Sequence, residues 1–154
     1  MPKGTGRNAA AGGGGRARNV VAGSPEARTA LDTARKRASD DFAKARKASG
    51  EATRQEKAAQ KAYRDFQRTS PPTGDDAQSR AQANRWAVEA GKLNTARSKA
   101  VASNIKAKDT LQEAKTRLRE VKAALKSNSS AGKLLRAGRA VPDRLKTSVK
   151  NALS

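Results

Sequence analysis

The sequence predicts an all-α protein, a long antiparallel coiled-coil-like helical hairpin between a flexible basic N-terminal arm and short basic amphipathic C-terminal helices. Apolar residues recur at heptad spacing over two long stretches, which is typical of paired helices. Pro71, Pro72 and Gly74 separate the two stretches and indicate a bend. Only 35% of the 154 residues are apolar and many of these are alanine, so a deep globular core is not expected.

Residues 1–23 predict the arm. They are rich in glycine and alanine, contain no acid and lack the apolar surface needed to fold alone, so we expect disorder unless the arm is bound. The glycine run at 12–15 follows no predicted strand and lacks the lysine and hydroxyl of a phosphate-binding loop, which favours a linker. The arm contributes four basic candidates for polyanion binding: Lys3, Arg7, Arg16 and Arg18.

Ser24, Pro25 and Glu26 predict the start of the first helix, which we expect at about 25–69 within a hairpin domain of 24–127. Its heptad pattern predicts a narrow seam, and alanine buries so little area that the hairpin alone should be only marginally stable. One predicted seam row consists of Leu31, Ala38, Ala45, Ala52, Ala59 and Phe66, and the other of Ala34, Asp41, Ala48, Gln55 and Ala62.

The second helix is expected at about 76–126, paired antiparallel with the first. Its predicted rows are Ala83, Ala90, Arg97, Asn104, Leu111, Leu118 and Leu125, and Trp86, Leu93, Ala100, Ala107, Ala114 and Val121. Mirroring the helices about the bend places Trp86 beside Ala59 and Tyr63, and Asp41 near Asn104. Such a polar layer either fixes the register of the pair or merely reaches solvent from a thin interface.

Residues 128–154 predict a separate basic amphipathic tail. Asn128 and the two serines after it suggest a helix end, followed by 131–140 and by a short helix that Pro142 starts and that ends near Leu153. Leu134, Val141, Leu145 and Val149 predict one apolar stripe. The opposite side has one acid, Asp143, and six basic candidates for polyanion binding: Lys133, Arg136, Arg139, Arg144, Lys146 and Lys150.

Positive charge is least compensated at the two ends of the chain. The chain has 34 basic and 14 acidic residues, for a net charge of +20, and this excess favours an acidic partner. Residues 24–70 carry net +5 and residues 71–127 net +6, whereas the two ends together carry net +9 with a single acid. Many hairpin acids precede a base by three or four residues, which predicts local pairing. The expected pairs are Asp32 with Lys36, Asp40 with Lys44, Glu89 with Lys92, and Glu113 with Arg117.

The residue inventory argues against catalysis. The chain has no cysteine and no histidine, which excludes disulfides, thiolate chemistry and the usual general base near neutral pH, and nearly all zinc sites. We therefore expect no enzymatic activity, cofactor, metal or small-molecule substrate. The aromatic residues lie at or beside the seams, so they are interpreted as core residues rather than a stacking platform for bases. They are Phe42, Tyr63, Phe66 and Trp86.

These patterns favour a structural protein that binds nucleic acid by its phosphates, without reading sequence, inside a nucleoid, the cytoplasm or a virion. No apolar run predicts a standard signal peptide or a membrane span. The composition resembles that of lysine- and alanine-rich histone-like proteins, and the glycine-led layout is similar to that of small internal phage proteins. These compositional resemblances assign no family. One alternative is a coiled-coil scaffold subunit that contacts mainly other proteins. Another is a tail that lies on anionic lipid, which the lack of aromatic anchors in residues 131–154 disfavours.

Overall fold

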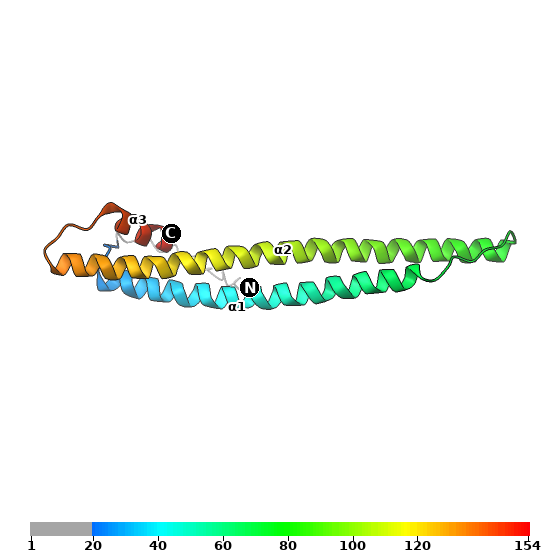
Figure 1. Ribbon diagram of the computed structural model, residues 1–154, viewed down its shortest axis with the longest axis horizontal. Coiled ribbons are helices and arrows are strands. Elements are labelled where there is room, and N and C mark those ends of the chain that lie inside the picture. Colours follow the sequence, from blue (N-terminus) through cyan, green and yellow to red (C-terminus); the bar gives the residue numbers. More distant parts are fainter. Residues whose placement is uncertain (1–19) are drawn as a thin grey trace, which may run out of the picture.

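The computed structural model describes residues 20–154, so residues 1–19 of the predicted disordered arm at 1–23 lie outside them. For residues 20–23 the prediction of disorder is wrong, because they pack on the helices. The described chain forms three helices: α1 (Pro25–Gln67), α2 (Ala77–Arg136) and α3 (Asp143–Leu153). Helices α1 and α2 run antiparallel side by side as a long rod, and α3 folds back onto one end of it (Figure 1). The all-helical prediction and the hairpin-like packing are confirmed for this part of the chain.

The helix starts follow the predicted capping residues. The Ser24 hydroxyl accepts a hydrogen bond from the Ala27 N–H at 3.1 Å, and Pro25 is the first residue of α1. Asp76 caps α2 by accepting from the Ser79 N–H at 2.9 Å and from the Ser79 hydroxyl at 2.6 Å. These hydrogen bonds stabilise the carboxylate and lower the pKa of Asp76.

The link between α1 and α2 is longer than the tight bend that the mirrored pairing assumed. It leaves α1 at Gln67 and runs as non-helical chain beside the first turns of α2 (Figure 1). Trp86 therefore stacks on Phe66 with ring centroids 5.1 Å apart, and its indole N–H donates to the Thr69 hydroxyl at 3.0 Å. The predicted placement of Trp86 beside Ala59 and Tyr63 is wrong, because extended chain covers more length per residue than helix does.

One of the two predicted rows of the α1 seam is confirmed. The first row is confirmed, since its first four members, Leu31, Ala38, Ala45 and Ala52, are buried and Ala59 and Phe66 are half-buried. The second row is wrong apart from the half-buried Ala34, since Asp41, Ala48, Gln55 and Ala62 are exposed. The covered residues are instead Phe42, Ser49, Glu56 and Tyr63. The predicted row offers mostly alanine, whereas the larger apolar areas of Phe42 and Tyr63 favour the observed side.

The seam on α2 is as predicted, and every position in both of its rows is buried or half-buried. The predicted end near residue 126 is wrong, because α2 continues to Arg136. Asn128 stays inside the helix and its side-chain oxygen accepts the Gly23 N–H at 2.6 Å, so a distant segment satisfies the amide. The helix ends instead at Arg136, and Gly138 follows its C-cap with a positive φ of 65°, which suits a glycine just after a helix.

The core lies at one end of the rod, called here the α3 end and formed by residues 20–31, 121–138 and α3. Its largest fully buried side chains are Leu31 from α1, Val121 from α2 and Val149 from α3. The predicted stripe members Val141, Leu145 and Val149 pack onto this core and so face the hairpin, whereas the fourth predicted member, Leu134, belongs to α2. Among described residues between Ala52 and Val121, by contrast, only Asn104 is buried. The rest of the rod is held by a thin interface.

Replacing Leu31 by alanine should lower the free energy of unfolding by about 2 to 5 kcal/mol, because it removes a large side chain that is 0% exposed in this core. Ile105→Ala is the matched control, because the isoleucine side chain is the same size but 56% exposed, and it should change stability by less than about 0.5 kcal/mol. Urea unfolding followed by circular dichroism measures both. Equal losses would place the core elsewhere.

Candidate nucleic-acid interface

The orientation of α3 sets the chemistry of its outer surface. Val149 and Ala152 are buried against the hairpin, so the opposite face of this helix turns outward. The surface of α3 outside the buried stripe carries Arg144, Lys146 and Lys150, and all three are exposed. The apolar stripe of α3 is thus buried against the hairpin, and the basic side chains are accessible to solvent.

Three more of the predicted basic residues lie where α2 ends and the chain turns toward α3. Lys133 and Arg136 occupy the last turn of α2, where cations interact favourably with the helix dipole. Arg139 follows the Gly138 cap, and all three side chains are exposed. The structure therefore collects the six C-terminal candidates at the α3 end (Figure 1).

Most of this charge has no acidic partner within the chain. Asp143 is the only acid among residues 121–154, and its carboxylate lies 3.0 Å from the Lys146 ammonium. No other ion pair within residues 20–154 involves the basic candidates at this end. Five of the six basic residues at this end therefore carry charge that no acid of the described chain pairs with.

Residues 20–23, called here the arm root, are held at the same end. Ala22 is buried, Val20 packs on the core, and the Gly23 N–H is held by Asn128. Gly23 has a φ of 95°, and its carbonyl oxygen lies so close to Gly132 that a Cβ there would meet it at 3.1 Å. The predicted site residues Lys3, Arg7, Arg16 and Arg18 lie outside the described residues. The chain that leads to them leaves from beside the C-terminal candidates.

The anchoring by Asn128 and Gly132 was not predicted, because Asn128 and the two serines after it suggest a helix end. A polar amide with a glycine one turn later in a helix is the signal that could have indicated it. Both residues serve instead to let the arm root approach α2 closely.

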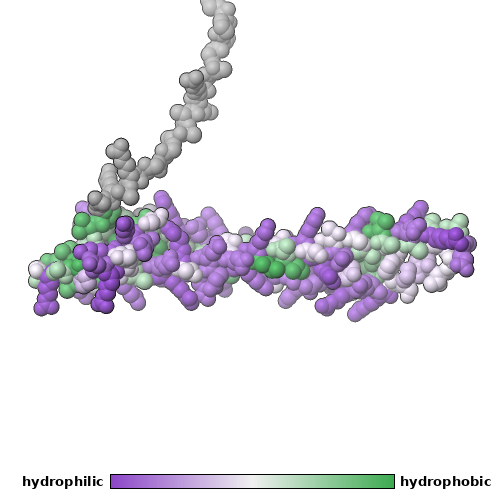
Figure 2. Space-filling view, turned by 90° about the horizontal axis from the view of Figure 1, so that it is seen from above, coloured by the Kyte–Doolittle hydropathy of each residue, from purple (hydrophilic) through white to green (hydrophobic). Residues whose placement is uncertain are grey.

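The sides of the rod carry fewer ion pairs than predicted. The Glu89 and Lys92 pair is present at 3.4 Å. The three other predicted pairs do not come within 4 Å in the described chain, while Asp65 pairs with Lys61 at 3.8 Å and with Arg68 at 3.7 Å. Hydrophilic side chains cover most of the face seen in Figure 2, and apolar residues reach it only in small separate areas. Basic residues along the rod are thus also available, though more acids lie among them.

A polar layer crosses the middle of the rod, with different partners from those predicted. Asp41 is exposed, so its predicted contact with Asn104 is wrong. The buried Asn104 instead accepts from the Thr53 hydroxyl at 3.1 Å and donates its amide to the Glu56 carboxylate. The shift follows from the longer link between the helices. A buried, satisfied amide of this kind fixes register.

Comparison of the chain with protein-family models, curated proteins and solved structures found no match. None of the three described helices combines the length and the apolar character needed to cross a bilayer. The interface is therefore interpreted from its own residues.

Two glycines of α2 test the anchoring of the arm root. Gly91→Ala should raise the free energy of unfolding by about 0.5 to 1 kcal/mol, because nothing lies within 4 Å of the new Cβ and alanine favours helix. Gly132→Ala brings the same helical gain, but its new Cβ would crowd the carbonyl oxygen of Gly23. Gly23 cannot easily move away, because its N–H is bonded to the Asn128 side chain. Gly132→Ala should therefore be neutral or destabilising in thermal unfolding. A gain equal to that of Gly91→Ala would mean that the root is not held there.

Proposed function

We propose that this protein is a non-enzymatic, basic structural component of a nucleoprotein assembly, such as a virion interior or a nucleoid, and that it binds nucleic acid without sequence specificity. The observation that carries the proposal is the packing of α3. Its apolar stripe is buried on the hairpin, so Arg144, Lys146 and Lys150 face outward beside the basic end of α2. This arrangement supports a phosphate-binding surface.

Binding by this surface follows from the chemistry of its side chains. Guanidinium groups donate paired hydrogen bonds to phosphate oxygens, and ammonium groups act as mobile point charges. Each phosphate that is neutralised releases condensed counter-ions, so affinity comes from charge and falls with salt. The surface offers no fixed pattern of donors and acceptors that would read base edges.

The aromatic residues also disfavour recognition of bases by stacking. Phe66 and Trp86 stack on one another, and the Arg97 guanidinium lies 4.6 Å from the Tyr63 ring centroid. Ring faces that are already covered do not provide a platform for unpaired bases. Duplex DNA or RNA bound along its backbone is the ligand that fits these residues.

The salt dependence of duplex binding tests the interface. Neutralising the six C-terminal candidates to glutamine should reduce the slope of log affinity against log salt by up to about 5 units, at about 0.9 for each lost phosphate contact. The substituted residues are Lys133, Arg136, Arg139, Arg144, Lys146 and Lys150. Fluorescence anisotropy with two duplexes of unrelated sequence measures the slope, and the two duplexes should bind alike.

The matched control removes the same amount of charge from the sides of the rod. Its six glutamine substitutions replace exposed residues away from the α3 end, namely Arg46, Lys47, Arg54, Lys57, Lys106 and Lys108. This variant should keep most of the wild-type slope. Equal losses in the two variants would show that net charge alone decides binding, and no binding at low salt would exclude the proposed function.

A second candidate function is a scaffold subunit that contacts mainly other proteins. The thin interface favours it, since Asn104 is the only buried residue described between Ala52 and Val121. Helices that bury so little area against each other gain stability from a further protein surface. Such a surface would cover the rod rather than the α3 end.

Hydrogen exchange compares the two parts of the rod. Amides of residues 84–103 should exchange faster than those of residues 118–131, because local opening is easier where few side chains are buried. Mass spectrometry of peptides over a range of protein concentrations gives the rates. Protection that appears in residues 84–103 only at high concentration would favour self-assembly, and uniform protection at every concentration would contradict the uneven core.

A further inference from the structure

An arginine stands in the interface between α1 and α2 without an acidic partner. Arg97 is half-buried, and its guanidinium lies over the Tyr63 ring, 4.6 Å from the centroid. No carboxylate of residues 20–154 comes within ion-pair distance of it. Glu56 lies on the same face of α1, but it accepts hydrogen bonds from Asn104 and Gln60. A half-buried cation of this kind lacks a counter-charge.

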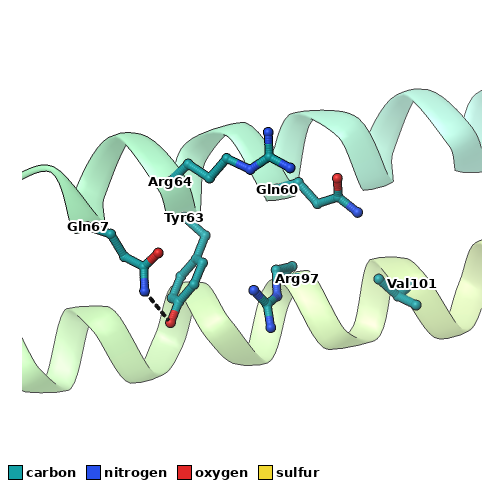
Figure 3. Close-up of a pocket in the computed structure, with 6 residues that line it drawn as sticks. All are labelled: Gln60, Tyr63, Arg64, Gln67, Arg97 and Val101. Carbon is teal, nitrogen blue, oxygen red and sulfur yellow. Dashed lines mark hydrogen bonds between the residues drawn. The ribbon is translucent and has the colours of Figure 1, made fainter.

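An open cavity of about 360 Å³ lies beside this arginine. Figure 3 shows the Tyr63 ring pointing from α1 toward α2, the Arg97 guanidinium in the space next to it, and Arg64 extending along α1 toward Gln60. The lining contains two guanidinium groups and no acid. Its members are Gln60, Tyr63, Arg64, Gln67, Arg97 and Val101.

The contacts within the lining hold hydrogen-bond donors ready for a ligand. The Tyr63 hydroxyl accepts from the Gln67 amide at 2.9 Å, which leaves its own O–H free to donate. The contact with the ring holds the Arg97 guanidinium beside the cavity, and no ion pair within residues 20–154 occupies its N–H groups. Guanidinium groups and a hydroxyl are the kinds of donor that phosphate oxygens accept from.

We propose that this cavity binds a phosphate group, which supplies the counter-charge that Arg97 lacks. The volume lies within the range of about 300 to 1,000 Å³ typical of ligand pockets. The site is formed by the last two turns of α1 and by Arg97 and Val101 of α2, so it is separate from the α3 end and does not rest on the proposed function (Figure 1). The phosphate belongs either to a small phosphorylated molecule or to a nucleic-acid backbone.

This assignment makes Arg97 unfavourable for folding when no anion is bound. The other members of its seam row are alanine, leucine and Asn104, whose amide is satisfied. Methionine has a similar length and no charge to desolvate, so Arg97→Met should raise the melting temperature in chloride. A stabilising substitution that abolishes ligand binding separates a binding role from a structural one.

Thermal unfolding in sodium phosphate and in sodium chloride of equal ionic strength and pH tests the site. The wild-type protein should melt at a higher temperature in phosphate, because binding to the native state raises its stability. In Arg97→Met the phosphate-specific rise should vanish, and in Arg64→Gln the affinity for phosphate should fall about tenfold or more. The control variants Arg46→Met and Arg119→Gln remove exposed charges outside the lining and should keep the full rise.

The outcomes decide the proposal in the following way. A wild-type protein with no phosphate-specific rise, or control variants that lose the rise as Arg97→Met does, would overturn the site. Side-chain nuclear magnetic resonance then identifies the source of the phosphate. If a short oligonucleotide shifts the Arg97 Nε signal as inorganic phosphate does, the site holds nucleic acid. If only the free ion shifts it, the site takes a small phosphate and excludes a nucleic-acid backbone. Neither outcome depends on duplex binding at the α3 end.

Discussion

The packing of Val149 from α3 with Leu31 and Val121 is the interaction on which the rest of this structure depends. These are the largest fully buried side chains in the described chain, and each comes from a different helix. Their burial holds α3 against the rod and so turns its basic face outward. The same cluster includes Ala22, which keeps the arm root beside α2. One small core therefore determines where the uncompensated charge lies.

Away from this core, specific contacts align the two long helices where buried area is small. Asn104 bonds to Thr53 and Glu56 across the interface, and near the link Trp86 stacks on Phe66 while it donates to Thr69. Such contacts add little net stability but strongly disfavour other registers, because a slip would leave a buried amide unsatisfied. Stability and register are thus supplied by different parts of the rod.

Features that depend on local sequence were predictable. Ser24 and Asp76 start helices by capping their first turns, and the apolar stripe of α3 and both rows of α2 follow from helical periodicity. The second row of α1 was missed because Phe42 and Tyr63 on the observed side are separated by the polar Ser49 and Glu56, and Glu56 finds its hydrogen-bond partner on α2 in Asn104. The end of α2 was missed for a similar reason, since the hydrogen bond that keeps Asn128 in a helix comes from Gly23.

The candidate interface was predictable in composition but not in arrangement. Counting charges identified the two ends of the chain as basic, and the six C-terminal candidates are exposed at the α3 end, whereas the four in the arm lie outside the described residues. That the arm root and the tail meet at one end of the rod depends on the contact between Gly23 and α2, which no local pattern encodes. The Arg97 cavity likewise needs both helices in register.

Chemical footprinting of lysines tests most directly whether the α3 end holds the polyanion. The protein is treated with an acetylating reagent with and without duplex DNA, and mass spectrometry gives the reaction rate at each lysine. Protection should concentrate at Lys133, Lys146 and Lys150, while Lys47 and Lys106 on the sides of the rod, all five being exposed, react at nearly unchanged rates. Uniform protection along the rod, or protection strongest at Lys47 and Lys106, would contradict an interface built around α3.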